Sequence, residues 1–135
     1  MDIEAVFNSI RTGLNAISGL PDFSMSPKHP DFVSSFPYTA LAWQSQTFDW
    51  EGSDNRWITP INTRMNLQAY IFTAPPWTDH PSLELARKAK LVQDKIAALT
   101  AAEGATYRCR VVDITTEYEA SGKWAAAIIT INVGA

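Results

Sequence analysis

The chain has 135 residues, of which 46% are hydrophobic and 19% are charged, a composition typical of a globular domain rather than a disordered segment. Eleven basic residues stand against fourteen acidic ones and give a formal net charge of −3, so the basic surface with which proteins hold DNA phosphates is not expected. The only cysteine, Cys109, has no partner for an internal disulfide, and no segment reaches the ~20 consecutive apolar residues of a membrane-spanning helix. We therefore expect one soluble domain over residues 1–135, made in the cytoplasm.

The N-terminal segment has the apolar spacing of an amphipathic helix. Over residues 2–17, one stripe of such a helix would carry Ile3, Val6, Phe7, Ile10, Leu14 and Ile17. Asp2 is a suitable N-cap, and Gly19 can end the helix because glycine enters the left-handed conformation easily. Residues 18–35 follow with three prolines and no periodicity, and a loop of that length is expected to bind something.

A long hairpin is predicted next. Residues 36–50 and 56–72 look extended, and the sequence EGSDN between them supplies turn-forming residues. Pro60 cannot donate to a strand ladder, so its part of the second strand should lie at an edge or a bulge. Farther along this strand, the apolar residues Met65, Leu67, Ala69 and Ile71 alternate with the polar residues Asn66, Gln68 and Tyr70. The strand should therefore have one apolar face and one polar face.

A second helix is predicted after the hairpin. Pro81 suits the first turn of a helix, and Thr78 or Asp79 could provide the cap. The predicted helix has one apolar face, which consists of Leu85, Ala89, Val92, Ile96 and Leu99.

A second hairpin closes the chain. Residues 106–119 and 124–135 have the composition of strands, and a turn at 120–123 joins them. In the first of these strands the apolar parity shifts between Val111 and Val112, which indicates a bulge or burial on both faces. The order helix, hairpin, helix, hairpin predicts an α+β fold, with two helices packed on a mainly antiparallel sheet.

Few residues have the pattern of a catalytic or metal site. Asp49, Glu51 and Asp54 could be metal ligands or an acid–base pair, but they lie at the predicted turn and no EF-hand spacing continues from them. Asp79 and His80 resemble a charge-relay pair, but adjacent side chains rarely face each other and helix capping explains them better. The sequence predicts no catalytic residue, no cofactor site and no metal site, and thus a protein that is not an enzyme.

The sequence contains five tryptophans. Trp50, Trp57 and Trp77 lie at the predicted turn, at a strand start and in a proline-rich loop, where aromatic side chains either pack on the core or anchor a protein interface. Trp43 and Trp124 lie within predicted strands and are expected to stabilise the fold. The candidate interface residues are Trp50, Trp57, Trp77, Asn66, Gln68 and Tyr70.

Two short motifs lie within this order of elements. FPY occupies Phe36–Tyr38, where the first long strand begins, and YIFTAP occupies Tyr70–Pro75, where the second strand ends. With a helix before them, and an amphipathic helix and a strand pair after them, the chain resembles the tail terminator, or tail-completion, family of long-tailed bacteriophages over nearly its whole length. The family has no enzymatic signature to place on this sequence.

The resemblance implies a structural virion protein of the phage tail or neck, assembled in the host cytoplasm. It implies a homo-oligomeric ring, commonly a hexamer, that caps the tail tube, ends its polymerisation and joins the tail to the head. The partners would be further copies of the chain, the tail tube protein and the head–tail connector protein. DNA would pass through the lumen without specific binding, and no membrane would take part. The face with Asn66, Gln68 and Tyr70 would meet a neighbouring subunit or the lumen.

Two other functions stay open at this point. Another phage neck or tail-tube component would assemble through similar strand edges at a different position in the tail. A small α+β domain that binds a ligand or catalyses a reaction would be a monomer with a deep apolar cavity and convergent polar groups.

Overall fold

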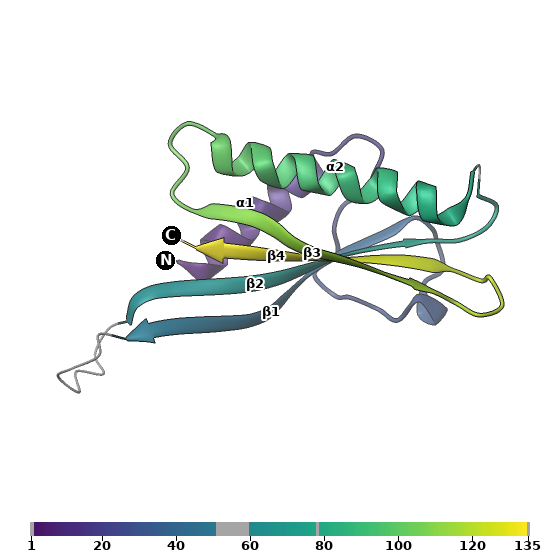
Figure 1. Cartoon of the computed structure of the whole chain (residues 1–135), viewed down its shortest axis with the longest axis horizontal. Coiled ribbons are helices and arrows are strands. Elements are labelled where there is room, and N and C mark those ends of the chain that lie inside the picture. The colour runs from purple at the N-terminus through teal and green to yellow at the C-terminus, as the bar shows by residue number, and fades with distance from the viewer. Residues whose placement is uncertain (1, 51–59, 78, 135) are drawn as a thin grey trace.

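The computed structural model describes residues 2–50, 60–77 and 79–134, with only the backbone described at 49, 50 and 60–62. The elements along the chain are α1 (Ile3–Asn15), the short 3-10 helix η1 (Pro30–Phe32), β1 (Tyr38–Trp50), β2 (Pro60–Thr73), α2 (Pro81–Ala101), β3 (Arg108–Tyr118) and β4 (Ala125–Gly134). Figure 1 shows the two helices and the two long hairpins. The predicted α+β class and the predicted order of elements are confirmed. None of the described helices is long and apolar enough to cross a membrane.

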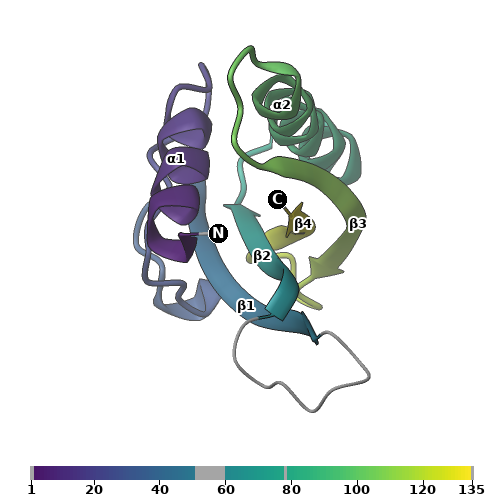
Figure 2. The same ribbon diagram turned by 90° about the vertical axis from the view of Figure 1, so that its left-hand side faces the viewer.

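The described strands form one antiparallel sheet in the order β1-β2-β4-β3. The two hairpins join through their second strands, because β2 pairs with β4 from Arg64 opposite Gly134 to Thr73 opposite Ala125. This pairing puts β2 and β4 in the centre of the sheet and leaves β1 and β3 as its edges. Seen along the strands, α1 lies beside β1, and α2 lies above the β3 side (Figure 2).

The hydrophobic core lies between the helices and the sheet face that they cover. The central strands contribute alternate, fully buried residues, namely Met65, Leu67, Ala69 and Ile71 from β2 and Ala127, Ile129, Ile131 and Val133 from β4. The helices contribute Val6, Ile10 and Leu14 from α1 and Leu85, Ala89, Val92 and Ile96 from α2. At Gly13 a Cβ atom would lie 2.9 Å from the side chain of Leu99, so the glycine lets α2 pack closely against α1. The predicted apolar faces of both helices are confirmed.

Helix α1 begins as predicted and ends slightly earlier. Asp2 is its N-cap, since Asp2 Oδ1 accepts a hydrogen bond from the backbone N–H of Ala5 at 3.1 Å. The helix ends at Asn15, and Gly19, with a φ of 95°, lies in the turn that follows. The glycine therefore redirects the chain beyond the helix rather than ending it.

Helix α2 is capped by a residue that was not the expected one. His80 is the N-cap, because its Nδ1 accepts the N–H of Ser82 at 3.2 Å. Asp79, expected as a cap, instead accepts the N–H of His80 at 2.7 Å and lies 3.1 Å from Arg87. The other expected cap, Thr78, lies outside the described residues. The carboxylate and the imidazole both serve the start of α2, as helix capping predicted, and do not form a charge-relay pair.

Two predicted irregularities of the sheet are confirmed. The register of β3 shifts at Val112, so this residue is the bulge that the change of apolar parity indicated. Pro60 opens β2 at a second register shift, as expected of a residue with no N–H to donate. A third shift, in β1 between Trp43 and Ser45, has no signal in the sequence.

The proline-containing segment 18–35 is tied to the body of the protein. Phe23 is fully buried, and its backbone N–H and C=O bond to the side chains of Asn15 and Arg11, both at 2.7 Å. Ser24 then forms a parallel bridge with Ala40 on the outer edge of β1. These contacts give the segment a structural role, and its expected binding role stays a prediction.

Candidate interaction surface

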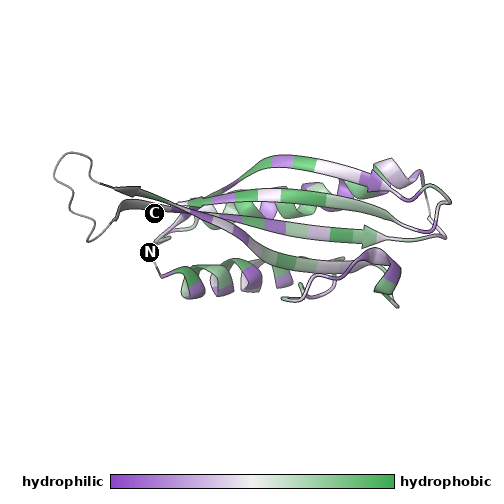
Figure 3. Cartoon of the chain, turned by 90° about the horizontal axis from the view of Figure 1, so that it is seen from below, coloured by the Kyte–Doolittle hydropathy of each residue, from purple (hydrophilic) through white to green (hydrophobic). Residues whose placement is uncertain are grey.

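The sheet face turned away from the helices carries the side chains that alternate with the core residues. On β2 these include Asn66, Gln68 and Tyr70, all half-buried, as the alternation predicted. Figure 3 views the sheet from the side opposite α2 and shows hydrophilic and hydrophobic residues mixed along the strands. On β4 the register places Thr130 beside Gln68 and Asn132 beside Asn66. We call the surface made of Ser45, Asn66, Gln68, Tyr70, Thr130 and Asn132 the polar face.

A row of hydrogen bonds crosses the polar face at one level of the sheet. Asn66 Nδ2 donates to Ser45 Oγ at 3.0 Å, and Asn132 Nδ2 donates to Asn66 Oδ1 at 2.8 Å. The row joins β1, β2 and β4, and Arg110 of β3 stands opposite Asn132. Cross-strand pairs of this kind contribute about 0.2–1 kcal/mol each. The row therefore fixes the orientation of the amides while leaving them partly exposed to solvent.

Tyr70 adds a second fixed polar group to this face. Its hydroxyl donates to Gln68 Oε1 at 2.5 Å, and its ring centroid lies 6.0 Å from that of Phe72. Partial burial raises the pKa of the Tyr70 hydroxyl, so the group stays protonated and remains a donor at neutral pH. The two central strands thus present neutral hydrogen-bonding groups.

Charged residues flank the neutral centre of the polar face. On β3 the exposed residues Arg108 and Arg110 lie towards one end of the sheet, and the exposed residue Glu117 lies towards the other. Asp113, also exposed, lies in the middle of the strand. Arg64 of β2 lies at the same end as the two arginines of β3. This edge of the face carries both signs of charge, in keeping with the net charge of −3.

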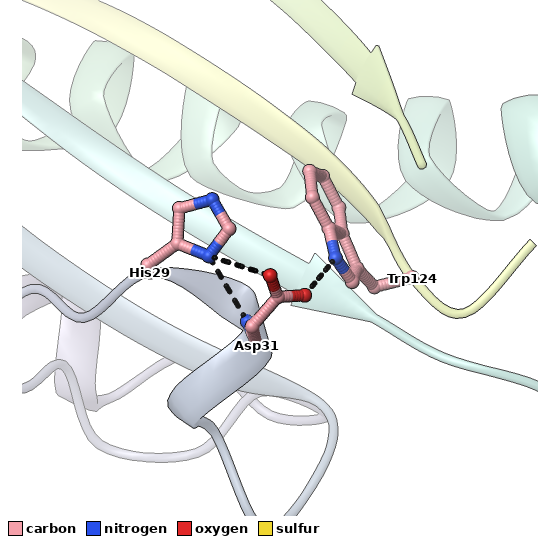
Figure 4. Close-up of polar contacts among 3 residues, drawn as sticks. All are labelled: His29, Asp31 and Trp124. Carbon is pink, nitrogen blue, oxygen red and sulfur yellow. Dashed lines mark hydrogen bonds and ion pairs between the residues drawn. The ribbon is translucent and has the colours of Figure 1, made fainter. Parts of the chain in front are cut away.

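The segment around η1 covers the other end of this side of the sheet. Trp124 Nε1 donates to Asp31 Oδ1 at 3.0 Å, and the ring of His29 meets the indole edge-on with centroids 5.8 Å apart (Figure 4). His29 Nδ1 accepts the N–H of Asp31 at 3.2 Å. A hollow of about 330 Å³ remains between this segment and the sheet, next to Tyr70 and Phe72. Trp124 holds the segment in place, which is the structural role expected of it.

The other tryptophans differ from the prediction. Trp43, expected in the core, is 56% exposed, because it lies on an edge strand that α1 covers only in part. Trp77, expected as an exposed anchor, packs partly buried against the core, and its Nε1 donates to Thr73 Oγ1 at 3.2 Å. The exposure expected of each side chain is therefore wrong, and the interface role of Trp77 stays a prediction. Trp57 and the side chain of Trp50 lie outside the described residues, so their interface role stays a prediction.

Ser45, Thr130 and Asn132 belong to the polar face but were not among the candidate residues. Asn132 alternates with the buried residues Ile131 and Val133, and this alternation was the available signal. It does not say which strands are neighbours, however. Only the pairing of β2 with β4 puts Asn132 beside Asn66, and only the pairing of β1 with β2 adds Ser45.

The remaining groups with possible chemistry form no active-site arrangement that the structure describes. Cys109 is buried, and burial raises the pKa of its thiol. The acidic residues Glu51 and Asp54 and the side chain of Asp49 lie outside the described residues. Within residues 2–50, 60–77 and 79–134, no group of three or more His, Cys, Asp or Glu side chains could hold a metal ion.

Comparison with known proteins gives no relative, since no protein-family model matches the sequence and no curated protein matches it. The class of the protein is therefore defined by its own fold and surface. Over the described residues it is an α+β protein in which α1 and α2 cover one face of a four-stranded antiparallel sheet. The other face has a neutral polar centre flanked by charged residues.

Proposed function

We propose that the protein is a structural subunit of a long-tailed bacteriophage, a tail terminator whose copies form a ring, commonly a hexamer in this family, on the end of the tail tube. In this role it ends tube polymerisation and joins the tail to the head connector. Support comes from the resemblance carried by FPY at Phe36–Tyr38 and by YIFTAP at Tyr70–Pro75, together with the order of helices and hairpins.

The observation that carries the proposal is the polar face. Its centre consists of amide and hydroxyl groups held by hydrogen bonds of 2.5 to 3.0 Å. Asn66 bonds to both Ser45 and Asn132, and Tyr70 bonds to Gln68. Binding to DNA grows with the number of phosphates that lysine and arginine neutralise. A ring lined by this neutral centre, with both signs of charge along its flank, would offer DNA phosphates few cationic contacts and let DNA pass through.

The first test is the mass of the purified chain in solution. Light scattering should give a mass near six times that of one chain, and electron microscopy of the same sample should show closed rings. A chain that stays monomeric at high concentration, and also in the presence of tail tubes, contradicts the proposal.

The second test is the effect of the ring on tube growth. The protein is added to polymerising tail tube protein of the phage that encodes it, and tube lengths are measured by electron microscopy against a sample without it. Tubes should become shorter as the ratio of ring to tube protein rises, with a ring at one end. Rings that leave tube growth unchanged would belong elsewhere in the neck. A chain that polymerises into tubes by itself would be a tail-tube component, and either result overturns the assignment as a terminator.

A further inference from the structure

The β1 edge of the sheet exposes a large apolar surface. Trp43, 56% exposed, borders a groove between α1 and β1 together with Phe7 and Leu41. Met25, also 56% exposed, lines the same groove. Exposed aromatic side chains that adjoin other apolar residues mark sites of interaction. This edge is therefore a candidate contact surface for another protein molecule.

The opposite edge of the sheet has a groove that suits such a side chain. It lies between α2 and β3 and has a volume of about 530 Å³, within the roughly 300–1,000 Å³ of typical binding sites. The small residues Ala86, Ala89 and Ala97 of α2 leave it open on one side, and Ile114 and Thr116 of β3 form the other wall. Its mainly apolar walls suit an aromatic ring.

We propose that Trp43 of one copy inserts into the groove between α2 and β3 of a second copy, so that β1 of the first copy lies beside β3 of the second. This inference rests on the proposed ring and names the surfaces through which its subunits meet. Each copy carries both halves of the contact on opposite edges of its sheet. It can therefore bind two neighbours at once.

The directions of the strands allow these two edges to pair. Every neighbouring pair in the sheet is antiparallel, so β1 and β4 run one way, and β2 and β3 run the other. Two copies placed side by side in the same orientation bring β1 of one against β3 of the other in the antiparallel sense. Such a contact satisfies backbone groups that an edge strand otherwise leaves open.

The outer edge of β1 is occupied over its first residues. The backbone of Ser24 bonds to the C=O of Thr39 at 2.9 Å and to the N–H of Leu41 at 2.8 Å. Because outward-pointing backbone groups recur every second residue, Trp43 is the next residue that offers them. A second copy thus meets β1 at the tryptophan.

The outer edge of β3 is occupied at its beginning as well. The hydroxyl of Thr100 accepts the N–H of Cys109 at 2.8 Å and donates to its C=O at 2.5 Å. The part of β3 beyond these contacts contains Ile114 and Thr116, the two strand residues that line the groove. Pairing the open part of β1 with the open part of β3 therefore brings Trp43 alongside the groove.

The helices beside the two edges have complementary charge. Helix α2 carries four basic and two acidic residues, a net positive charge. Lys90 and Asp94, which pair with each other at 2.9 Å, both line its groove. Helix α1 with its cap Asp2 carries one basic and two acidic residues, and Glu4 lies on the rim of the groove beside Trp43. Contact between the β1 edge and the β3 edge sets the net acidic α1 beside the net basic α2. Contact between two β1 edges, or between two β3 edges, would set helices of the same sign together. This favours a head-to-tail arrangement, which closes into a ring when the rotation between copies allows it.

The test uses one variant for each half of the contact. Trp43→Ser removes the inserted side chain, and Ala86→Phe fills the groove. Phe32→Ser, at an aromatic residue that is 79% exposed, and Ala98→Phe, on α2 outside the groove, are the matched controls. Light scattering should show monomers for the first two variants and wild-type rings for the two controls. All four should keep the wild-type circular dichroism spectrum.

Mixing the two defective variants tests the contact directly. The Ala86→Phe chain still has Trp43, and the Trp43→Ser chain still has an open groove, so one intact contact can form between them. The mixture should therefore give a species of twice the monomer mass and nothing larger. A mixture that stays monomeric, or a Trp43→Ser chain that still forms rings, overturns the contact.

The outcomes separate this inference from the proposed function. If rings still form in both Trp43→Ser and Ala86→Phe, the proposed ring stands and only the proposed contact surfaces are wrong. If the rings depend on both residues but do not stop tube growth, the contact stands and the terminator role is wrong. A wild-type chain that is monomeric under all conditions overturns both.

Discussion

Trp43 and Leu67 stand opposite each other on neighbouring strands, but Trp43 is 56% exposed and Leu67 is fully buried. We expect Trp43→Ala to lower the free energy of unfolding of the monomer by about 1 kcal/mol or less and Leu67→Ala by about 2–5 kcal/mol, because only the second substitution leaves a cavity. Urea denaturation at low protein concentration, where assembly does not contribute, measures both values. Equal losses would place Trp43 in the core after all.

Cys109 gives a second prediction at the scale of the residue. Burial raises the pKa of its thiol, and the hydrogen bond to Thr100 opposes this shift. We expect a thiol reagent to modify Cys109 at least 100-fold more slowly in the folded protein than in urea, because the thiolate is the reactive form. Equally fast modification in both states would contradict the buried position.

Because burial raises the pKa of the Cys109 thiol, this residue should make the free energy of unfolding fall as the pH rises. The folded protein keeps the thiol proton at a pH where the unfolded chain has begun to lose it. The contribution of Cys109 to stability is therefore fully present below the unfolded pKa and is lost as the pH rises through the folded pKa. Cys109→Ser, which lacks the thiol, is the control for this effect.

At the scale of the element, the start of α2 depends on His80. Its Nδ1 is the acceptor for the N–H of Ser82, so His80→Ala should lower the free energy of unfolding by about 1 kcal/mol. His80→Asn should lower it by less, since asparagine is among the best N-caps. Thermal unfolding followed by circular dichroism compares the two. If both variants melt together with the wild type, the cap adds nothing to the helix.

The row of hydrogen bonds across the polar face should stabilise the pairing of β2 with β4. Asn66 and Asn132 share a hydrogen bond of 2.8 Å between the two hairpins. A double-mutant cycle with Asn66→Ala and Asn132→Ala should give a coupling energy of about 0.5–1 kcal/mol. The pair Asn66→Ala and Thr116→Ala, on opposite faces of the sheet, should be additive. Additivity in both cycles would show that the row does not stabilise the sheet.

At the scale of the whole molecule, the charge distribution predicts weak binding to DNA. With a net charge of −3 and a neutral polar face, we expect a Kd weaker than about 10⁻⁴ M for duplex DNA at about 0.15 M salt. Fluorescence anisotropy with labelled DNA measures it. If the polar face lines the lumen, Asn66→Lys with Asn132→Lys should slow the passage of DNA through rings. A submicromolar Kd for the wild type would contradict a passive lumen.

Much of the fold could be predicted because local patterns report local geometry. The alternation from Met65 to Ile71 fixes which side of β2 is buried, and the change of parity at Val112 marks a real bulge. The polar face could be predicted only in part, since Asn66, Gln68 and Tyr70 follow from alternation within one strand. The candidate tryptophans were less reliable, because a large apolar residue looks the same in sequence at an edge and in a core.

The sequence by itself determined the two helices, the two hairpins and the α+β class, because periodicity and turn residues act over a few neighbouring residues. Only the tertiary structure decided that β2 pairs with β4, and therefore that β1 and β3 are edges. This pairing joins residues far apart in the chain, such as Asn66 and Asn132, and no local pattern encodes it. It exposes Trp43 and sets the groove between α2 and β3 on the other edge, because exposure depends on which strands lie side by side.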